Sequence, residues 1–123
     1  MKKRIIAGSA LVALLAVAVL TTTVSGAIAR SGAKPLPASS CSAIKNSGGK
    51  YLIASDLPLQ GAGRTQTIEM TKAIEFILKQ HSWKAGKYTL AYQSCDDSTA
   101  QAGKWDSGKC SANANAYAQN KDL

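Results

Sequence analysis

A short apolar run without alternation, YLIAS at residues 51–55, most constrains what this chain can fold into. Such a run suits a strand that is buried on both faces, as in a parallel sheet. A loop rich in glycine and proline follows at residues 56–63. From Thr65 onward the apolar residues recur at helical spacing. The pattern predicts a strand that ends in a glycine-rich loop and leads into a helix.

The predicted helix has one apolar face and ends near His81. Its apolar residues are spaced i, i+3, i+4, i+7 and i+8: Met70, Ala73, Ile74, Ile77 and Leu78. A second strand is predicted at residues 88–94, where the sequence YTLAYQS is rich in β-prone residues. A polar loop follows, and Asp106 or Ser107 can cap a second helix.

The predicted order of strand, helix, strand and helix is that of a βαβ unit, which builds a parallel sheet. Two strands and two helices leave much of each apolar surface uncovered, whereas parallel sheets are normally covered on both faces. We therefore expect an α/β fold, the first βαβα of a doubly wound parallel-sheet lobe, in a truncated form.

Residues 1–29 have the order of a secretory signal peptide. Three positive charges in residues 1–4 precede an apolar run at 5–20 and small uncharged residues at 21–29. Cleavage is expected after Ala29, and the alternative is an uncleaved membrane anchor. Either form places the protein outside the cytoplasm, in the periplasm or on the extracellular face of the cell membrane.

The remaining chain divides by composition. Residues 30–49 are rich in Ser, Gly, Ala and Pro and predict a flexible linker, so the folded part is expected at residues 50–123. The chain carries a net charge of +8, but its lysines are scattered and form no stripe of the kind that binds nucleic acid.

Three cysteines, Cys41, Cys95 and Cys110, fit an exported protein, because disulfides persist outside the cytosol. The odd number leaves one thiol without a partner. Cys95 ends the second predicted strand and Cys110 lies on the first turns of the next helix. These positions are near each other in a βα unit, so Cys95–Cys110 is the slightly favoured disulfide, with Cys41 free or paired outside the fragment.

No catalytic, nucleotide or metal motif stands out. The pair Gly61-x-Gly63 lacks the third glycine of a dinucleotide fingerprint. Asp96 and Asp97 are interpreted as turn formers, and His81 as a surface residue at a helix end. Because no nucleophile, base and orienting group occur together, we expect a protein that is not an enzyme and that has no cofactor and no metal. In open α/β sheets, ligands bind outside the carboxyl ends of the strands, so the loops after both strands favour small-molecule binding.

Several segments together resemble the N-terminal lobe of periplasmic-type solute-binding proteins of branched-chain amino acid ABC transporters, the leucine/isoleucine/valine-binding family. They are the exported leader, YLIASDLPLQGAGRTQTIEMTKAIEFIL, GKYTLAYQSCDDST and WDSGKCSANANAYA. The resemblance implies two α/β lobes that close on an amino acid or similar small solute and deliver it to a membrane ABC permease. It places the first loop in the ligand cleft, with candidates Leu59, Gln60, Gly61, Ala62 and Gly63. Ala62 stands where family members can carry an aromatic side chain. The family also implies that Cys95 can pair with a cysteine after a third strand.

Two main hypotheses follow from the sequence. The first is the extracytoplasmic solute-binding component of an ABC importer for branched-chain or related amino acids, present as an N-terminal fragment. The alternative is a small exported or membrane-anchored envelope interaction domain that binds no ligand. An exported enzyme is the weakest class, and the sequence leaves the solute open.

Overall fold

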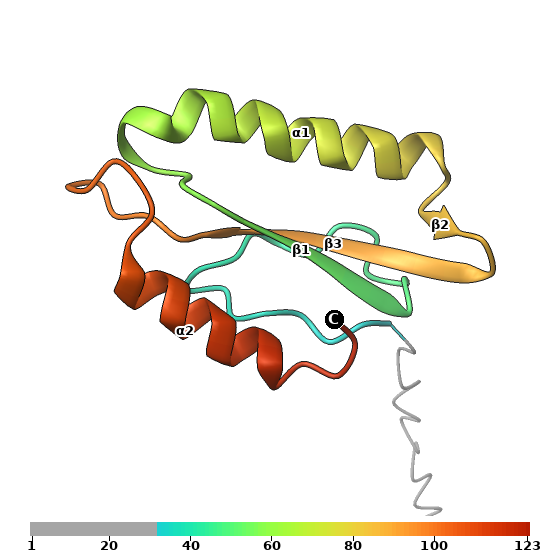
Figure 1. The fold of residues 1–123 in the computed structure, drawn as a ribbon. Coiled ribbons are helices and arrows are strands. Elements are labelled where there is room, and N and C mark those ends of the chain that lie inside the picture. Colours follow the sequence, from blue (N-terminus) through green and yellow to red (C-terminus); the bar gives the residue numbers. More distant parts are fainter. Residues whose placement is uncertain (1–31) are drawn as a thin grey trace, which may run out of the picture.

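The computed structural model describes residues 32–123 (Figure 1). The predicted leader, residues 1–29, lies outside the described residues. The elements are β1 (Tyr51–Leu57), a 3-10 turn (Gly61–Gly63), α1 (Arg64–Gln80), β2 (Lys84–Ala85), β3 (Tyr88–Asp96) and α2 (Ser107–Ala118). No helix within residues 32–123 is long and apolar enough to cross a membrane.

The sheet has three strands in the order β1-β3-β2. β1 and β3 are parallel, with Tyr51 opposite Leu90 and Leu57 opposite Asp96. The βαβ unit predicted from the sequence is therefore confirmed, and the fold is mixed α/β. β2 was not predicted: it forms a two-residue antiparallel hairpin with β3, and Gly86, at φ 57°, makes the turn.

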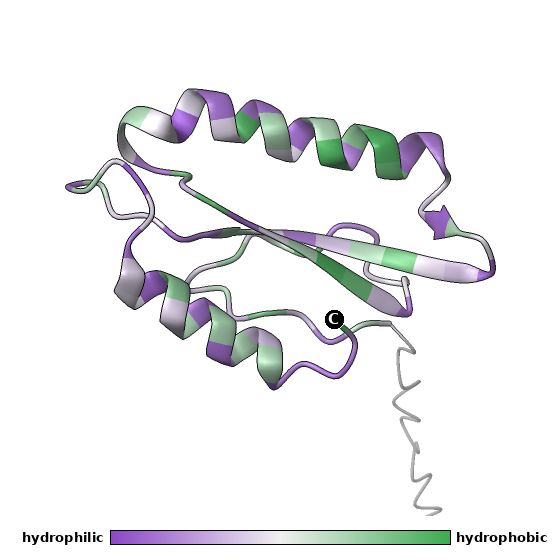
Figure 2. Cartoon of the chain, in the orientation of Figure 1, coloured by the Kyte–Doolittle hydropathy of each residue, from purple (hydrophilic) through white to green (hydrophobic). Residues whose placement is uncertain are grey.

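The helices lie on opposite faces of the sheet, with α1 on one side and α2 on the other, beside the N-terminal segment of residues 32–49 (Figure 1). Both helices alternate polar and apolar residues along their length, whereas β1 carries a continuous apolar stretch (Figure 2). The two faces of β1 are covered unequally near its start: Leu52 is 3% exposed, whereas Tyr51 is 37% and Ile53 is 36% exposed.

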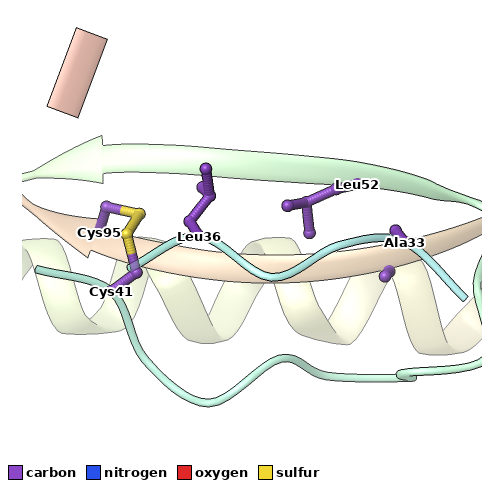
Figure 3. Packing of buried hydrophobic residues seen from close by; sticks show 6 residues of the cluster. Ala33, Leu36, Cys41, Leu52 and Cys95 are labelled. Carbon is purple, nitrogen blue, oxygen red and sulfur yellow. A yellow bond between two sulfur atoms is a disulfide. The ribbon is translucent and has the colours of Figure 1, made fainter. Parts of the chain in front are cut away.

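Residues 32–49 are not a flexible linker, and that prediction is wrong for them. Ala33, Leu36 and Cys41 are buried and pack with Leu52 and other sheet residues in the hydrophobic core (Figure 3). The composition is misleading because small residues and prolines also suit an extended segment that lies flat on a sheet.

Backbone pairing and one buried amide hold the N-terminal segment to β3. Lys45 and Tyr92 exchange backbone hydrogen bonds of 2.8 and 3.0 Å. The Gln93 side chain, only 2% exposed, accepts a bond from Leu36 N (2.7 Å) and donates one to Ser42 O (2.7 Å). Because a buried amide must be paired, Gln93 specifies where this segment sits.

The buried face of α1 differs from the predicted one. Ile74 and Leu78 are half-buried, as predicted, but Ile77 is 52% exposed and Met70 is 45% exposed. The most buried residue of α1 is Thr67, whose hydroxyl donates to the carbonyl of Pro58. The buried side of α1, which contains Thr67, Ile74 and Leu78, is therefore rotated relative to the face that hydrophobic spacing alone predicts.

Candidate functional site

The loops that follow β1 and β3 meet at the carboxyl edge of the parallel pair, as the βαβ order predicts. The backbone N–H of Gln60 donates to Ser98 Oγ at 3.0 Å, and that of Gly63 donates to Gly103 O at 3.3 Å. The two loops therefore form one continuous wall at this edge.

Asp96, the last residue of β3, joins the parts of this wall. Its Oδ1 accepts hydrogen bonds from Leu59 N (2.9 Å), Ser98 N (3.0 Å) and Ser98 Oγ (2.6 Å). Its Oδ2 accepts from the Gln60 side chain and from Lys109 Nζ on α2 (3.2 Å). Burial works to raise the pKa of this carboxyl, but the bonds from Ser98, Gln60 and Leu59 outweigh it and hold the pKa well below its usual range.

The interpretation of Asp96 as a turn former is confirmed, since its bond to Ser98 N closes an Asx turn. Its role in tying two loops and a helix together was missed. The available signal was an aspartate at a strand end, followed two residues later by serine and preceding a lysine on the next helix. Its partner loop cannot be named from that pattern, because Leu59 lies far away in the sequence.

Two glycines allow the loops to touch. Gly61 has φ 67°, and a Cβ there would lie 2.2 Å from the Cα of Gly103, which itself has φ 60°. Gly61, one of the predicted cleft candidates, therefore faces the backbone of the neighbouring loop at this contact.

The five cleft candidates of the first loop divide into engaged and exposed residues. The backbone amides of Leu59, Gln60 and Gly63 are all taken by internal acceptors. Gly61 and Ala62 are exposed at the rim of the wall. The backbone N–H groups of Leu59, Gln60 and Gly63 are therefore not free for a ligand, whereas the tip of the loop is open to solvent.

The disulfide joins Cys41 to Cys95. The predicted Cys95–Cys110 bridge is therefore wrong, and so is the pairing that the resemblance implies, between Cys95 and a cysteine after a third strand. Cys41 lies opposite Cys95 in an antiparallel bridge, so the N-terminal segment brings its thiol to β3. Cys110 is half-buried on α2 and is free within the described part of the chain. Cys41 lies in the segment predicted to be a flexible linker, and a flexible linker would not hold it next to Cys95.

A buried polar cluster beneath α2 was not predicted. Asn113, 3% exposed, donates to Asp56 Oδ1 (2.8 Å) and to Asp96 O (3.1 Å). Asp97 Oδ1 and the Tyr117 hydroxyl are buried and find no hydrogen-bond partner within residues 32–123. Burial, together with the charges of Asp56 and Asp96, raises the pKa of Asp97. Strand alternation could have indicated that Asp56 faces this cluster.

The remaining chemistry-bearing residues lie apart from one another. Asp106 caps α2 and accepts from Lys109 N at 3.0 Å, which confirms the predicted cap. His81 is exposed at the C-terminal end of α1, at the opposite end of that helix from the Gly61 loop. Among residues 32–123, no three His, Cys, Asp or Glu side chains come close enough together to hold a metal ion.

Comparisons with known proteins give no relative for this chain. No family model, no curated protein and no solved structure matches it.

Proposed function

We propose that this chain forms the beginning of the N-terminal lobe of an extracytoplasmic solute-binding protein. In its full-length form this protein serves an ABC importer for branched-chain or related amino acids. Its partners are an amino acid or similar small solute and the ABC permease in the membrane. The observation that carries the proposal is the wall at the carboxyl edge of β1 and β3, the place where open α/β sheets bind their ligands.

The two edges of the sheet support a doubly wound lobe. The outer edge of β3 is covered by β2 and by the segment around Lys45. The outer edge of β1 is open: the backbone groups of Ala54 and Asp56 that point away from β3 have no partner within residues 32–123. A further parallel strand at this edge would satisfy them.

The path of the chain after α2 leads to the same edge. α2 runs back from the carboxyl edge, and Asp122 O then accepts a hydrogen bond of 2.7 Å from Leu52 N, near the start of β1. A strand that entered here would run parallel to β1, with α2 as its crossover. This geometry supports the finer proposal of a first βαβα within a doubly wound, type I periplasmic binding protein-like lobe.

The wall supplies one side of a pocket. Enclosure of a small solute needs further sides, because ligand sites bury most of the ligand surface. In the proposed two-lobed form, Gly61 and Ala62 lie at the rim of the cleft. The Asp96 hydrogen bonds hold that rim in place, so its role is to position the loop tip.

A chimera tests the proposal. Residues 50–123, with residues 32–49 retained to cover β3, replace the matching first βαβα of a known leucine-binding protein. We expect a cooperatively folding chimera that binds leucine in calorimetry. A chimera that folds but does not bind leucine, while the parent binds it, would contradict the role of this wall; a chimera that does not fold would contradict the doubly wound placement.

The second candidate is a small exported or membrane-anchored envelope interaction domain without ligand binding. One observation favours this second candidate. The backbone N–H groups of Leu59, Gln60 and Gly63 donate to acceptors within the fold, so the loop offers few hydrogen-bond donors to a solute. A cooperative melt of the unfused chain, combined with a chimera that binds no leucine, would favour this candidate over the first.

A further inference from the structure

The end of the molecule opposite the candidate site carries a cluster of exposed lysines and tyrosines. We call it the basic–aromatic end and define it by Lys50, Tyr51, Lys84, Lys87 and Tyr88. These residues lie at the N-terminal ends of β1 and β3 and on the β2 hairpin. Tyr51 is 37% exposed and Tyr88 is 47% exposed, although both begin strands.

The two tyrosines form one surface feature. Their rings meet edge to face, with centroids 5.2 Å apart, and they line a hollow of about 280 Å³ together with Ala85 and Leu90. Lys50 Nζ lies 5.5 Å from the centre of the Tyr51 ring, and Lys87 Nζ lies 5.5 Å from that of Tyr88. Each tyrosine ring therefore has a lysine ammonium group beside it. Apolar ring surface and positive charge lie next to each other on this end of the molecule.

Charge is strongly divided along the molecule. The segments 44–55 and 76–95, which include the basic–aromatic end and extend along β1 and β3 toward the carboxyl edge, contain lysines and no acidic residue. Four of the seven acidic residues, Asp56, Asp96, Asp97 and Asp106, lie at or after the carboxyl ends of the strands. Of the others, Glu69 and Glu75 pair with lysines on α1, whereas Asp122 lies near the start of β1, where its carbonyl accepts from Leu52 N and its carboxylate accepts from Lys34 N. Within residues 32–123, Lys50, Lys84 and Lys87 form no salt bridge, so their charges are free to meet an anionic surface.

The start of the described chain lies at this same end. Ala33 N donates to Gly49 O at 2.6 Å, directly beside Lys50, and residue 32 is close to the start of β1 (Figure 1). The apolar run at residues 5–20 is thus joined to the fold at the basic–aromatic end.

From these observations we infer that the basic–aromatic end docks on the surface of an anionic lipid bilayer. Tyrosine rings prefer the boundary between headgroups and acyl chains, and each lysine near an anionic surface adds attraction. The exposed Tyr51 and Tyr88 rings favour a bilayer over a soluble polyanion, because a polyanion offers no apolar boundary for them to enter. The inference does not rest on the proposed solute-binding function.

Two tryptophans provide an internal comparison. Trp83 precedes Lys84 at the basic–aromatic end, whereas Trp105 is 60% exposed and pairs with Ser98 at the carboxyl edge. Single-tryptophan forms of the full chain, Trp105→Phe and Trp83→Phe, are reconstituted in vesicles whose lipids carry bromine near the headgroup end of the acyl chains. We expect bromine to quench Trp83 strongly and Trp105 weakly in vesicles that contain phosphatidylglycerol. The preference should disappear in pure phosphatidylcholine and at 1 M salt, where screening acts within about 3 Å.

Charge variants complete the test. Replacing Lys84 and Lys87 by Gln should lower the docking equilibrium constant roughly 25-fold, at roughly 5-fold for each lysine. The matched control, Arg64→Gln with Lys104→Gln, removes two exposed positive charges at the other end and should leave quenching of Trp83 unchanged. The docking surface is supported if the Lys84 and Lys87 variant reduces the quenching of Trp83 and the Arg64 and Lys104 control does not. Circular dichroism must show that both variants keep the fold of the parent. Equal quenching of both tryptophans, or quenching of Trp83 that is indifferent to phosphatidylglycerol, would overturn it.

Discussion

Removing the Cys41–Cys95 disulfide is expected to cost a large share of the stability of this protein. The bridge closes a loop over a sequence separation of 54 residues. By the chain-entropy relation, opening a loop of that size costs about 4 kcal/mol, mainly because the unfolded chain regains its freedom. Small domains are stable by only about 5–15 kcal/mol in total. Cys41→Ala should therefore leave a folded but marginal protein.

The measurement is urea unfolding under oxidising conditions, followed by circular dichroism. With a slope of about 2 kcal/mol per molar urea, the midpoint of Cys41→Ala should fall by about 2 M. Cys110→Ala is the matched control, and its midpoint should stay close to that of the parent because Cys110 is free and half-buried. Reductant should shift the parent and Cys110→Ala down together and leave Cys41→Ala unchanged.

The reverse pattern would refute the reasoning. A large loss in Cys110→Ala with a loss below about 1 kcal/mol in Cys41→Ala would mean that the bridge runs to Cys110 and that residues 32–49 do not need to be fastened to β3. Peptide mapping without reduction identifies the linked peptides directly and separates this outcome from an effect of core packing.

Two further predictions concern the carboxylates and the helix face. Asp96→Asn should destabilise by about 2 kcal/mol at neutral pH, since bonds to a charged acceptor are lost. The low pKa of Asp96 contributes stability that is present above about pH 4 and lost as the pH falls below it, whereas the raised pKa of Asp97 makes stability decline as the pH rises through the carboxyl range. The free energy of unfolding is measured by urea between about pH 3 and pH 7. In Asp96→Asn it should no longer fall toward low pH because of this residue, and in Asp97→Asn it should no longer decline as the pH rises. The same pH dependence of the free energy of unfolding in both variants would contradict this account. On α1, Leu78→Ala should cost about 2 kcal/mol and Ile77→Ala less than about 0.5 kcal/mol, because Ile77 is 52% exposed; equal losses in thermal melts would restore the face predicted from spacing.

Local patterns determined the order of elements. The apolar run at residues 51–55 became most of β1, and the β-prone run at 88–94 became most of β3. The amphipathic stretch between them became α1, and Asp106 capped α2 as expected. Each of these features depends on residues within a few positions of one another, so a reading of the sequence is enough to find them.

The choices between distant partners were decided only in the folded structure. Cys95 pairs with neither of the partners expected from the sequence, Cys110 or a cysteine after a third strand, because the antiparallel contact of residue 41 with β3 brings Cys41 to it. Gly61 lies in the short turn after β1, and the folded structure sets it against Gly103 of the loop after β3, a contact that the sequence does not indicate.

Orientation within an element was also a tertiary matter. Spacing identified an apolar side of α1, yet Thr67 is the buried residue, bonded to the carbonyl of Pro58, while Met70 and Ile77 are exposed. The same holds for Asp96, whose sequence neighbours predict a turn, while its bonds to Leu59 and Lys109 exist only because the parallel pairing of β1 and β3 brings both loops and α2 to one edge. Sequence periodicity reports which residues can be buried together, whereas the closure of long loops decides which of them are.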